Sequence, residues 1–399
     1  MKCKITSSEM SPFMSFGKMP IANGFLQKEN FKNEFFFDLE VGFSEKICLF
    51  QLKDHPTPEQ MFNENYPFFT GSSQAMKAHF KEYADFIKKN FIKKNSKIIE
   101  IGSNDGTFLN NFKDSNIEYI GFEPSSNVAK IANLNGINTL NQFFGLESLD
   151  LIKKFHHQTN VIFAANVICH IPKLVELIKT VDQLLSKDGV FIFEEPYLGS
   201  MFEKTSYDQI YDEHIFMFSA TSVKKIFNMY NFELTDLVKQ KTHGGSMRYI
   251  ISRKNARDIT KNVQLILDNE KFYNLDNIES CNVFKKNCET SKLKLNNTLK
   301  NFISDGKKIV GYAATSKSTT ILNYCGIDSN IIEYICDTTK EKIGKYSPGM
   351  HIPIVSIDHF RNDNPDIAYL FAWNHKEEIL KKEKKFSQEV GKWISHVTL

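Results

Sequence analysis

The stretch that decides the fold is Ile98-Ile-Glu-Ile-Gly-Ser-Asn-Asp-Gly-Thr-Phe-Leu109. It begins as an apolar run that is typical of a buried strand, and it continues into a turn with two glycines. Gly102 permits a tight turn at the strand end, and Gly106 lets the backbone approach a ligand closely. Such a turn brings backbone N–H groups to the crevice at the carboxyl edge of a parallel sheet. The stretch therefore predicts a ligand-binding loop in an α/β domain.

The charge of this loop distinguishes two kinds of ligand. A nicotinamide fingerprint needs glycine at its first, third and sixth positions, and here Asn104 and Thr107 occupy the last two. The carboxylate of Asp105 would repel a pyrophosphate. S-adenosylmethionine has no phosphate and carries an ammonium and a sulfonium, which favour nearby carboxylates such as Glu100 and Asp105. We therefore expect the loop, including Gly102, Asn104 and Gly106, to bind S-adenosylmethionine.

Strands and helices alternate around the loop. The pattern predicts helices at 73–94, 126–135 and 174–185, and strands at 97–101, 119–123, 161–165 and 189–194. This alternation is typical of a parallel sheet with helices on both faces. Glu123, at the end of the second strand, is expected to bind the ribose hydroxyls of the donor. Asn166 and His170 follow another strand end and are expected in the same pocket, although a structural role at a helix start is an equal alternative for His170.

The chain divides into four parts. Residues 1–75 contain short apolar pieces between Gly, Pro and Asn, which predict a small β-rich lobe. Residues 76–255 form the predicted methyl-donor domain. Residues 256–305 have apolar positions at helical spacing with no Pro or Gly, which predicts a helical connector. Residues 306–399 show a second, smaller strand–helix alternation with strands at 307–312, 331–337 and 367–372. We therefore expect an α/β protein with two Rossmann-like domains.

Composition excludes several functional classes. The chain has 399 residues, which is too long for one ordinary core. Its 50 basic and 47 acidic side chains leave a net charge of +3, which is no electrostatic signature of nucleic-acid binding. No apolar run approaches the ~20 residues that span a bilayer, and residues 1–10 lack the core of a secretory signal. We expect a cytoplasmic protein without membrane contact; the oligomeric state is not predicted.

Three segments outside the donor loop carry a more specific pattern: Glu194-Glu-Pro-Tyr-Leu-Gly199, Tyr211-Asp-Glu-His-Ile-Phe-Met-Phe-Ser219 and His243-Gly-Gly-Ser-Met-Arg248. Together with 16–25, 311–317, 322–327 and 348–353, they resemble the sugar C-methyltransferase family along nearly the whole chain. That family methylates carbon on nucleotide-linked 4-keto deoxysugars. The resemblance therefore implies a small-molecule nucleotide sugar as substrate.

Carbon methylation needs a carbanion equivalent, which forms when a base removes a proton next to a carbonyl. An unperturbed histidine has a pKa of about 6.5 and suits this task. A neighbouring carboxylate can orient the imidazole, and a phenol can donate to the developing enolate oxygen. The resemblance implies that His214 is the base and that Tyr211 and Glu213 assist. Asp212, where the family often has His, is expected to face away. Without the resemblance, a structural hydrogen-bond cluster would be the preferred interpretation.

Four further residues are candidates for ligand contact. His243 and Arg248 could bring a backbone and a guanidinium to an anionic substrate, and a hairpin with a salt-bridged Arg is an equally good interpretation. Lys317 follows a strand end and could contact either a diphosphate or solvent. The resemblance places Tyr66 against the methyl donor, and an ordinary packed aromatic is the alternative.

The N-terminal lobe departs from the family. Its relatives usually hold a zinc ion with two Cys-x-x-Cys pairs, whereas this chain keeps Cys3 but has Thr6 at the paired position. The second pair falls at Ser44 and Ile47, and Cys48 is one residue out of place. Ser, Thr and Ile are poor zinc ligands. We therefore predict no structural zinc and no other metal site.

The leading hypothesis is an S-adenosylmethionine-dependent C-methyltransferase that methylates the carbon next to the keto group of a nucleotide-diphosphate keto deoxysugar. One alternative is an O- or N-methyltransferase that acts on another glycan precursor. The other is a degenerate relative that binds sugar nucleotides without catalysis, an alternative suggested by the lost cysteines.

Overall fold

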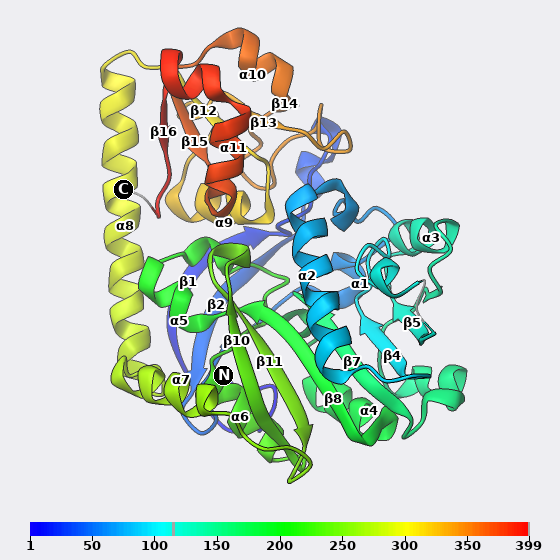
Figure 1. Ribbon diagram of the computed structural model, residues 1–399. Helices are drawn as coiled ribbons and strands as arrows, with labels where there is room; N and C mark the ends of the chain where they lie inside the picture. Colours follow the sequence, from blue (N-terminus) through cyan, green and yellow to red (C-terminus); the bar gives the residue numbers. More distant parts are fainter. Residues whose placement is uncertain (114–115, 398–399) are drawn as a thin grey trace.

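The computed structural model describes residues 1–113 and 116–397, and Figure 1 shows their arrangement. Three sheets organise this part of the chain: a four-stranded, a seven-stranded and a five-stranded one. The predicted α/β class, with two mainly parallel sheets, is confirmed. None of the described helices is both long enough and apolar enough to cross a membrane.

The seven-stranded sheet contains β4 (Lys97–Ile101), β5 (Glu118–Phe122), β6 (Thr139–Leu140), β7 (Thr159–Ala165), β8 (Leu185–Pro196), β10 (Phe232–Gln240) and β11 (Ser246–Arg253). Their order is β10-β11-β8-β7-β4-β5-β6. The strands from β8 to β6 are parallel, so the carboxyl ends of β4, β5 and β7 meet at one edge. The antiparallel hairpin β10–β11 at the other side of the sheet is a feature that the parallel prediction lacked.

Helices cover both faces of this sheet, as predicted. On one face α2 (Gln74–Phe91) buries apolar residues at helical spacing, among them Phe80 and Tyr83, against β4, β7 and β8. On the other face lie α4 (Leu174–Leu184) and α6 (Ala220–Asn228). The shorter helices α3 (Ser126–Leu134) and α5 (Leu198–Lys204) follow β5 and β8 in the chain. This packing places the strand ends, with their polar loops, at the open edge.

The four-stranded sheet forms the N-terminal lobe with strands β1 (Ser11–Pro20), β2 (Phe36–Ser44) and β3 (Leu49–Leu52), followed by the short helix α1 (Pro58–Met61). Its fourth strand, β9 (Phe216–Met217), comes from the middle of the chain and pairs with β3. Because β9 directly follows the Tyr-Asp-Glu-His segment, pairing with the lobe anchors the candidate catalytic residues.

The C-terminal sheet is parallel, with the order β14-β13-β12-β15-β16. Its strands are β12 (Ile309–Tyr312), β13 (Ile335–Asp337), β14 (Ile354–Ser356), β15 (Ile367–Leu370) and β16 (Lys392–Ile394). Helix α9 (Ser316–Cys325) packs on one face, and α10 (Ile357–Asp363) and α11 (Lys376–Lys382) pack on the other. The loop between β12 and α9 points toward the central sheet (Figure 1).

Two helices connect the domains, α7 (Lys261–Phe272) and the long α8 (Ile278–Ser304). Figure 1 shows α8 running along one side of the molecule beside the lobe and the C-terminal domain. Buried residues of α8 join one apolar cluster with residues of β1, β2 and the C-terminal sheet. The lobe and the C-terminal domain therefore share a core, although they stand at opposite ends of the chain.

Candidate functional site

A cavity of about 1270 Å³ lies where the lobe, the central sheet and the C-terminal domain meet. Pockets for a single small ligand usually measure about 300–1000 Å³, so this cavity has room for a donor and an acceptor together. The predicted residues that line it are Tyr66, Glu100, Gly102, Asn104, Glu123, Asn166, His170, Tyr211, Glu213, His214, His243 and Lys317. Asp105, Gly106 and Arg248 are not among the lining residues.

The loop after β4 is built around Gly102, which adopts a φ of +67°. A side chain at this position would also overlap the side chain of Val167, which follows β7. The loop continues beside Glu123 at the end of β5, whose Oε2 accepts a hydrogen bond from Asn104 N at 3.1 Å. Its Oε1 accepts another from Ser125 N at 2.7 Å. The carboxylate is thus held at the cavity wall with lone pairs left for a ligand's hydroxyl groups.

Buried carboxylates gather at this end of the cavity. Burial, with the neighbouring charge of Asp105, raises the pKa of Glu100 well above its usual value, and its Oε2 has no hydrogen-bond partner within the described chain. Burial also raises the pKa of Glu123. A ligand with positive charge would favour the ionised forms of both groups. The donor set therefore fits the ammonium and sulfonium of S-adenosylmethionine.

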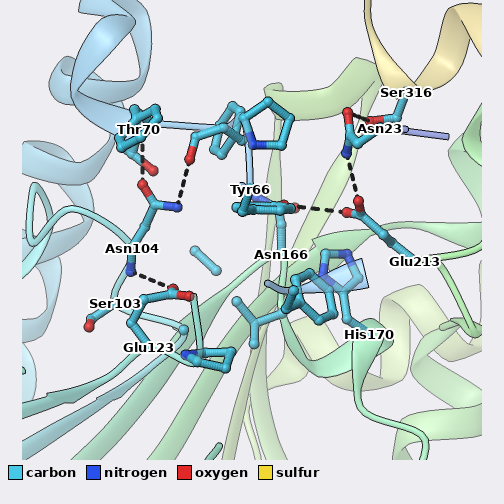
Figure 2. Close-up of a pocket in the computed structure, with 18 of the residues that line it drawn as sticks. Asn23, Tyr66, Thr70, Ser103, Asn104, Glu123, Asn166, His170, Glu213 and Ser316 are labelled. Atoms are coloured by element: carbon cyan, nitrogen blue, oxygen red, sulfur yellow. Dashed lines mark hydrogen bonds between the residues drawn. The ribbon is translucent and has the colours of Figure 1, made fainter. Parts of the chain in front are cut away.

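A strap from the lobe, residues 66–71, lies over the donor loop (Figure 2). Asn104 holds it twice: its Oδ1 accepts from Thr70 N at 2.9 Å and its Nδ2 donates to Phe68 O at 3.2 Å. The carboxylate of Asp105 accepts from Gly71 N at 2.7 Å, so it secures the strap and does not line the cavity. The strap carries Tyr66, whose ring lies between the donor loop and Glu213 in Figure 2.

Asn166 and His170 lie on the loop after β7. Asn166 has a φ of 56° and a buried Oδ1 with no partner in the described residues. The ring of His170 stacks between Phe62 and His214, with centroid separations of 5.7 and 5.3 Å. Burial lowers its pKa to about 3, so the ring is neutral at pH 7. Both residues present a polar group without a protein partner at the cavity, which favours the ligand-binding interpretation over the structural one.

His214 and Tyr211 form a hydrogen-bonded pair. His214 Nδ1 lies 2.7 Å from Gln209 O, and Nε2 lies 2.7 Å from Tyr211 Oη. A carbonyl oxygen can only accept, so the neutral ring carries its proton on Nδ1, and Nε2 accepts from Tyr211. Burial holds the pKa of His214 well below 6.5. The imidazole is therefore an unprotonated base whose tautomer is set by a backbone carbonyl, not by the carboxylate that the sequence suggested.

Glu213 is buried beside this pair and has other partners. Its Oε1 accepts from Asn23 Nδ2 at 2.6 Å, and its Oε2 accepts from the Tyr66 hydroxyl at 3.5 Å. Burial and the neighbouring Asp212 raise the pKa of Glu213 to about 8. Asp212 itself does not line the cavity, and its Oδ1 accepts from Ala22 N at 3.0 Å. Asp212 therefore faces away from the cavity, as expected. It does not face solvent, because it is buried and binds the lobe.

Two lysines lie at the opposite wall, in the C-terminal domain. Lys317, in the first turn of α9, is buried, and its Nζ lies 3.3 Å from Asn374 Oδ1. Lys342 donates from Nζ to Ala314 O at 2.8 Å. Burial lowers the pKa of both ammonium groups. An anionic ligand would favour their charged forms, so this wall suits phosphate groups.

The two candidate residues of the segment 243–248, His243 and Arg248, lie in different surroundings. His243 lines the cavity with an unusual φ of 52°, and its buried Nε2 has no partner in the described chain. Arg248 instead lies on β11, where its guanidinium donates twice to Glu194 Oε2, at 3.2 and 3.0 Å, and covers the ring of Tyr83. A guanidinium held in this way is not available to a substrate. The salt-bridged hairpin is therefore the correct interpretation of Arg248.

Sequence reasoning missed three groups that the structure brings to this site. Asn23 and Lys342 line the cavity, and the carbonyl of Gln209 orients His214. The segment 16–25, which contains Asn23, resembled the family. That resemblance gave no sign that Asn23 binds Glu213. A backbone carbonyl such as that of Gln209 leaves no sequence pattern.

Comparison with known families agrees with this architecture. The model of a methyltransferase domain matches residues 76–237, that of a C-methyltransferase C-terminal domain matches 241–398, and that of a zinc binding domain matches 3–62. A curated relative, the C-methyltransferase NovU of Streptomyces niveus, is 27% identical over 384 residues, which are 96% of this chain and 91% of the relative.

Solved structures resemble parts of the chain. A complex of the Haloferax volcanii Trm112 methyltransferase activator with a methyltransferase is 10% identical, with a TM-score of 0.38, over 46% of this chain and 95% of that one. The CurJ carbon methyltransferase is 16% identical, with a TM-score of 0.36, over 47% of this chain and 57% of that one.

The lobe's residues do not fit the zinc ion that its family description implies. Cys3 Sγ lies 3.5 Å from Thr6 N. Cys48 Sγ lies 2.9 Å from the ammonium of Lys225, whose charge repels a cation. Among the described residues, one group with metal-ligand spacing was found, Cys169 with His170 and His214, and it lies outside the lobe.

We therefore expect purified protein to contain less than about 0.1 zinc per chain, since structural zinc needs four N or S ligands. Elemental analysis by mass spectrometry would measure this, and dialysis against a chelator should leave the thermal unfolding midpoint unchanged. The double variant Cys3→Ser/Cys48→Ser is the control for adventitious thiol binding. Stoichiometric zinc in the wild-type protein that survives dialysis against the chelator would contradict the prediction.

Proposed function

Because the chain is an S-adenosylmethionine-dependent methyltransferase that resembles the C-methyltransferases over nearly its whole length, we propose that it methylates carbon. The acceptor is the carbon next to the keto group of a nucleotide-diphosphate keto deoxysugar. The observation that carries this proposal is the distribution of charge along one cavity. Glu100 and Glu123 lie at its donor end, the buried ammonium groups of Lys317 and Lys342 lie at its C-terminal wall, and the neutral His214 lies between them. Asp337 also lines the C-terminal wall, where its carboxylate accepts from Ala314 N and Thr339 N.

The two ends suit two different ligands. Glu100 and Glu123 match a cationic donor with a ribose, as described above. Lys317 and Lys342 match the diphosphate of the acceptor by charge. An acceptor with its diphosphate at the lysines would extend its sugar toward His214, which lines the middle of the same cavity. A neutral acceptor would leave the two lysines without a function.

In the middle of the cavity, His214 is the candidate base that removes a proton from the acceptor. Bound S-adenosylmethionine supplies an electrophilic methyl group. His214 is neutral, so its Nε2 can take the proton from the carbon next to the carbonyl, provided that Tyr211 gives up its hydrogen bond or passes the proton along. Transfer to a hydroxyl oxygen also uses a base, so the choice of carbon rests on the likeness to C-methyltransferases. The His214–Tyr211 pair supplies the base that such a transfer needs.

The test is incubation with keto-sugar nucleotides in deuterated water. We expect a mass gain of one methyl group in the presence of donor, and deuterium uptake at the adjacent carbon. Methyl gain without exchange of the carbon-bound proton would favour the O- or N-methyltransferase alternative. Failure to bind S-adenosylmethionine in a calorimetric titration would favour the degenerate alternative. No mass gain with any keto-sugar nucleotide, despite donor binding, would contradict the proposed substrate class.

A further inference from the structure

The segment Ala22–Asn23 of the N-terminal lobe lies between the Tyr-Asp-Glu-His loop and the start of α9. Asp212 binds Ala22 N, and Thr319 Oγ1 donates to Ala22 O at 2.9 Å. The backbone of Ala22 is thus bonded on both sides. The side chain of Asn23 lies at the cavity, next to Glu213 and Ser316, which bind it directly (Figure 2).

The amide of Asn23 bridges two domains. Its Nδ2 donates to Glu213 Oε1 at 2.6 Å, and its Oδ1 accepts from Ser316 Oγ at 3.1 Å. An amide nitrogen can only donate, so Oε1 of Glu213 must offer a lone pair. The Ser316 hydroxyl holds Oδ1 on the far side and thereby keeps the nitrogen toward Glu213. When Glu213 is protonated, its proton is therefore on Oε2, which lies on the side of Tyr66.

We propose that Asn23 is a positioning residue of the reaction, which orients the carboxyl group of Glu213 so that Oε2 donates a proton to the carbonyl oxygen of the acceptor. This inference rests on the proposed carbon methylation. It names the acid that complements His214, and it assigns the orientation of that acid to a residue of the lobe.

The hydrogen bond between Tyr211 and His214 supports Glu213 as the acid. A phenol was the expected donor to the developing enolate oxygen, but the Tyr211 hydroxyl is used by His214 Nε2. Glu213 Oε2 and the Tyr66 hydroxyl remain on that side of the cavity. Burial raises the pKa of Tyr211 well above that of an ordinary phenol, so the carboxylic acid of Glu213 is the stronger acid of the two.

The protonation state of Glu213 agrees with this role. Burial and the neighbouring Asp212 raise its pKa, which favours the protonated carboxyl group. The titratable groups that face it are Asp212 and Tyr211 of its own loop, Tyr66 of the strap, Cys169 after β7 and Lys342 of the C-terminal domain. Burial and Asp212 raise this pKa, whereas the hydrogen bonds from Asn23 and Tyr66 and the charge of Lys342 lower it.

Every proton that moves in the proposed reaction is returned or released within one turnover. The Tyr211 hydroxyl takes the proton from the acceptor carbon as it passes its own proton to His214 Nε2, while Glu213 Oε2 gives its proton to the carbonyl oxygen, which forms an enol. The enol carbon bonds to the methyl group as the methyl–sulfur bond breaks, and the oxygen returns its proton to Glu213 as the carbonyl reforms. His214 releases its proton to solvent. Each turnover thus leaves all three residues in their starting state.

The experiment compares Asn23→Leu with Thr319→Val under saturating donor and acceptor. Thr319→Val removes a hydrogen bond between the same two segments without touching Glu213. We expect Asn23→Leu to lower kcat about 100-fold, since misplacement of a reacting group by ~1 Å has this effect, while the Kd of the donor stays unchanged. Thr319→Val should keep kcat within about threefold of the wild type, as expected for loss of one neutral hydrogen bond outside the reacting groups.

The pH profile separates positioning from a merely structural role. Glu213 must be protonated to donate, so kcat should fall as the pH rises through its raised pKa. The bond from Asn23 favours the ionised carboxylate, and its loss raises this pKa. The fall of kcat at alkaline pH should therefore move to higher pH in Asn23→Leu and stay at the wild-type pH in Thr319→Val.

A double-mutant comparison completes the test. On a Glu213→Gln background, Asn23→Leu should cause no further loss, because its effect acts through the carboxyl group. An additive loss, an unmoved fall of kcat at alkaline pH, or equal effects of Asn23→Leu and Thr319→Val would overturn the inference. If Asn23→Leu does not fold, Asn23→Asp keeps the shape, removes the donor and should shift this fall in the same direction. A wild type that methylates no keto-sugar nucleotide contradicts the proposed function instead, so the two failures are distinguishable.

Discussion

Replacement of His214 by Gln is expected to lower methyl transfer and deuterium exchange by the same factor of about 1000, which is typical for loss of a general base. The variant keeps a donor for the carbonyl of Gln209 but lacks a basic ring nitrogen. Because proton removal precedes bond formation, the two rates should fall together. Donor affinity should not change, since the hydrogen bonds that hold Glu123 and Asn104 do not involve His214. Mass spectrometry of the acceptor measures both rates in one sample.

The matched control is His359→Gln, which changes an exposed histidine on α10 that does not line the cavity. It should react at the rate of the wild type. A His214→Gln protein that exchanges and methylates at the wild-type rate would show that another group is the base. A variant that exchanges normally but fails to methylate would assign His214 to methyl transfer and not to proton removal.

Replacement of Glu123 by Gln is expected to raise the Kd of the donor about 100-fold. The carboxylate already accepts from Asn104 N and Ser125 N, and the ribose hydroxyls would share its remaining lone pairs. An amide offers one acceptor oxygen in place of two and turns its NH₂ toward a backbone N–H. Loss of two hydrogen bonds to a charged group, at about 1.5–3 kcal/mol each, exceeds the roughly 2.7 kcal/mol that a 100-fold change requires, so the estimate is conservative.

Calorimetric titration with S-adenosylhomocysteine measures this affinity without turnover. The control is Glu118→Gln, at the opposite end of the same strand, where the carboxylate only pairs with Lys97 and Lys154 at the surface. Such surface pairs contribute little, so this variant should bind as the wild type does. Equal affinities for Glu123→Gln and the wild type would place the ribose elsewhere in the cavity.

The donor half of the site could be predicted from sequence because its residues are close in the chain and repeat a local pattern. The strand at 97–101 was predicted with its observed bounds, and Gly102 has the positive φ that its turn required. Glu123 lies at a strand end beside the loop, as expected. Each of these features depends on backbone periodicity and turn chemistry, which a single sequence expresses.

The acceptor half could not be predicted in the same way, because its contacts join distant segments. Asn23 meets Glu213 across 190 positions and Ser316 across 293. The partner of Arg248, Glu194, lies on a neighbouring strand of a sheet that was expected to be wholly parallel. No local pattern encodes such pairs, since they depend on how the three sheets pack.

At Asn23 the lobe meets the Tyr-Asp-Glu-His loop and α9, which are made later in synthesis. The site is therefore completed only late in the synthesis of the chain. The donor loop and its sheet are synthesised well before α9, and domains generally fold as units during synthesis. We therefore expect a ribosome-bound chain to bind the methyl donor while Ser316 and Lys317 are still missing. Because these two residues line the same cavity, we expect methyl transfer to begin only after the last domain has folded against the first.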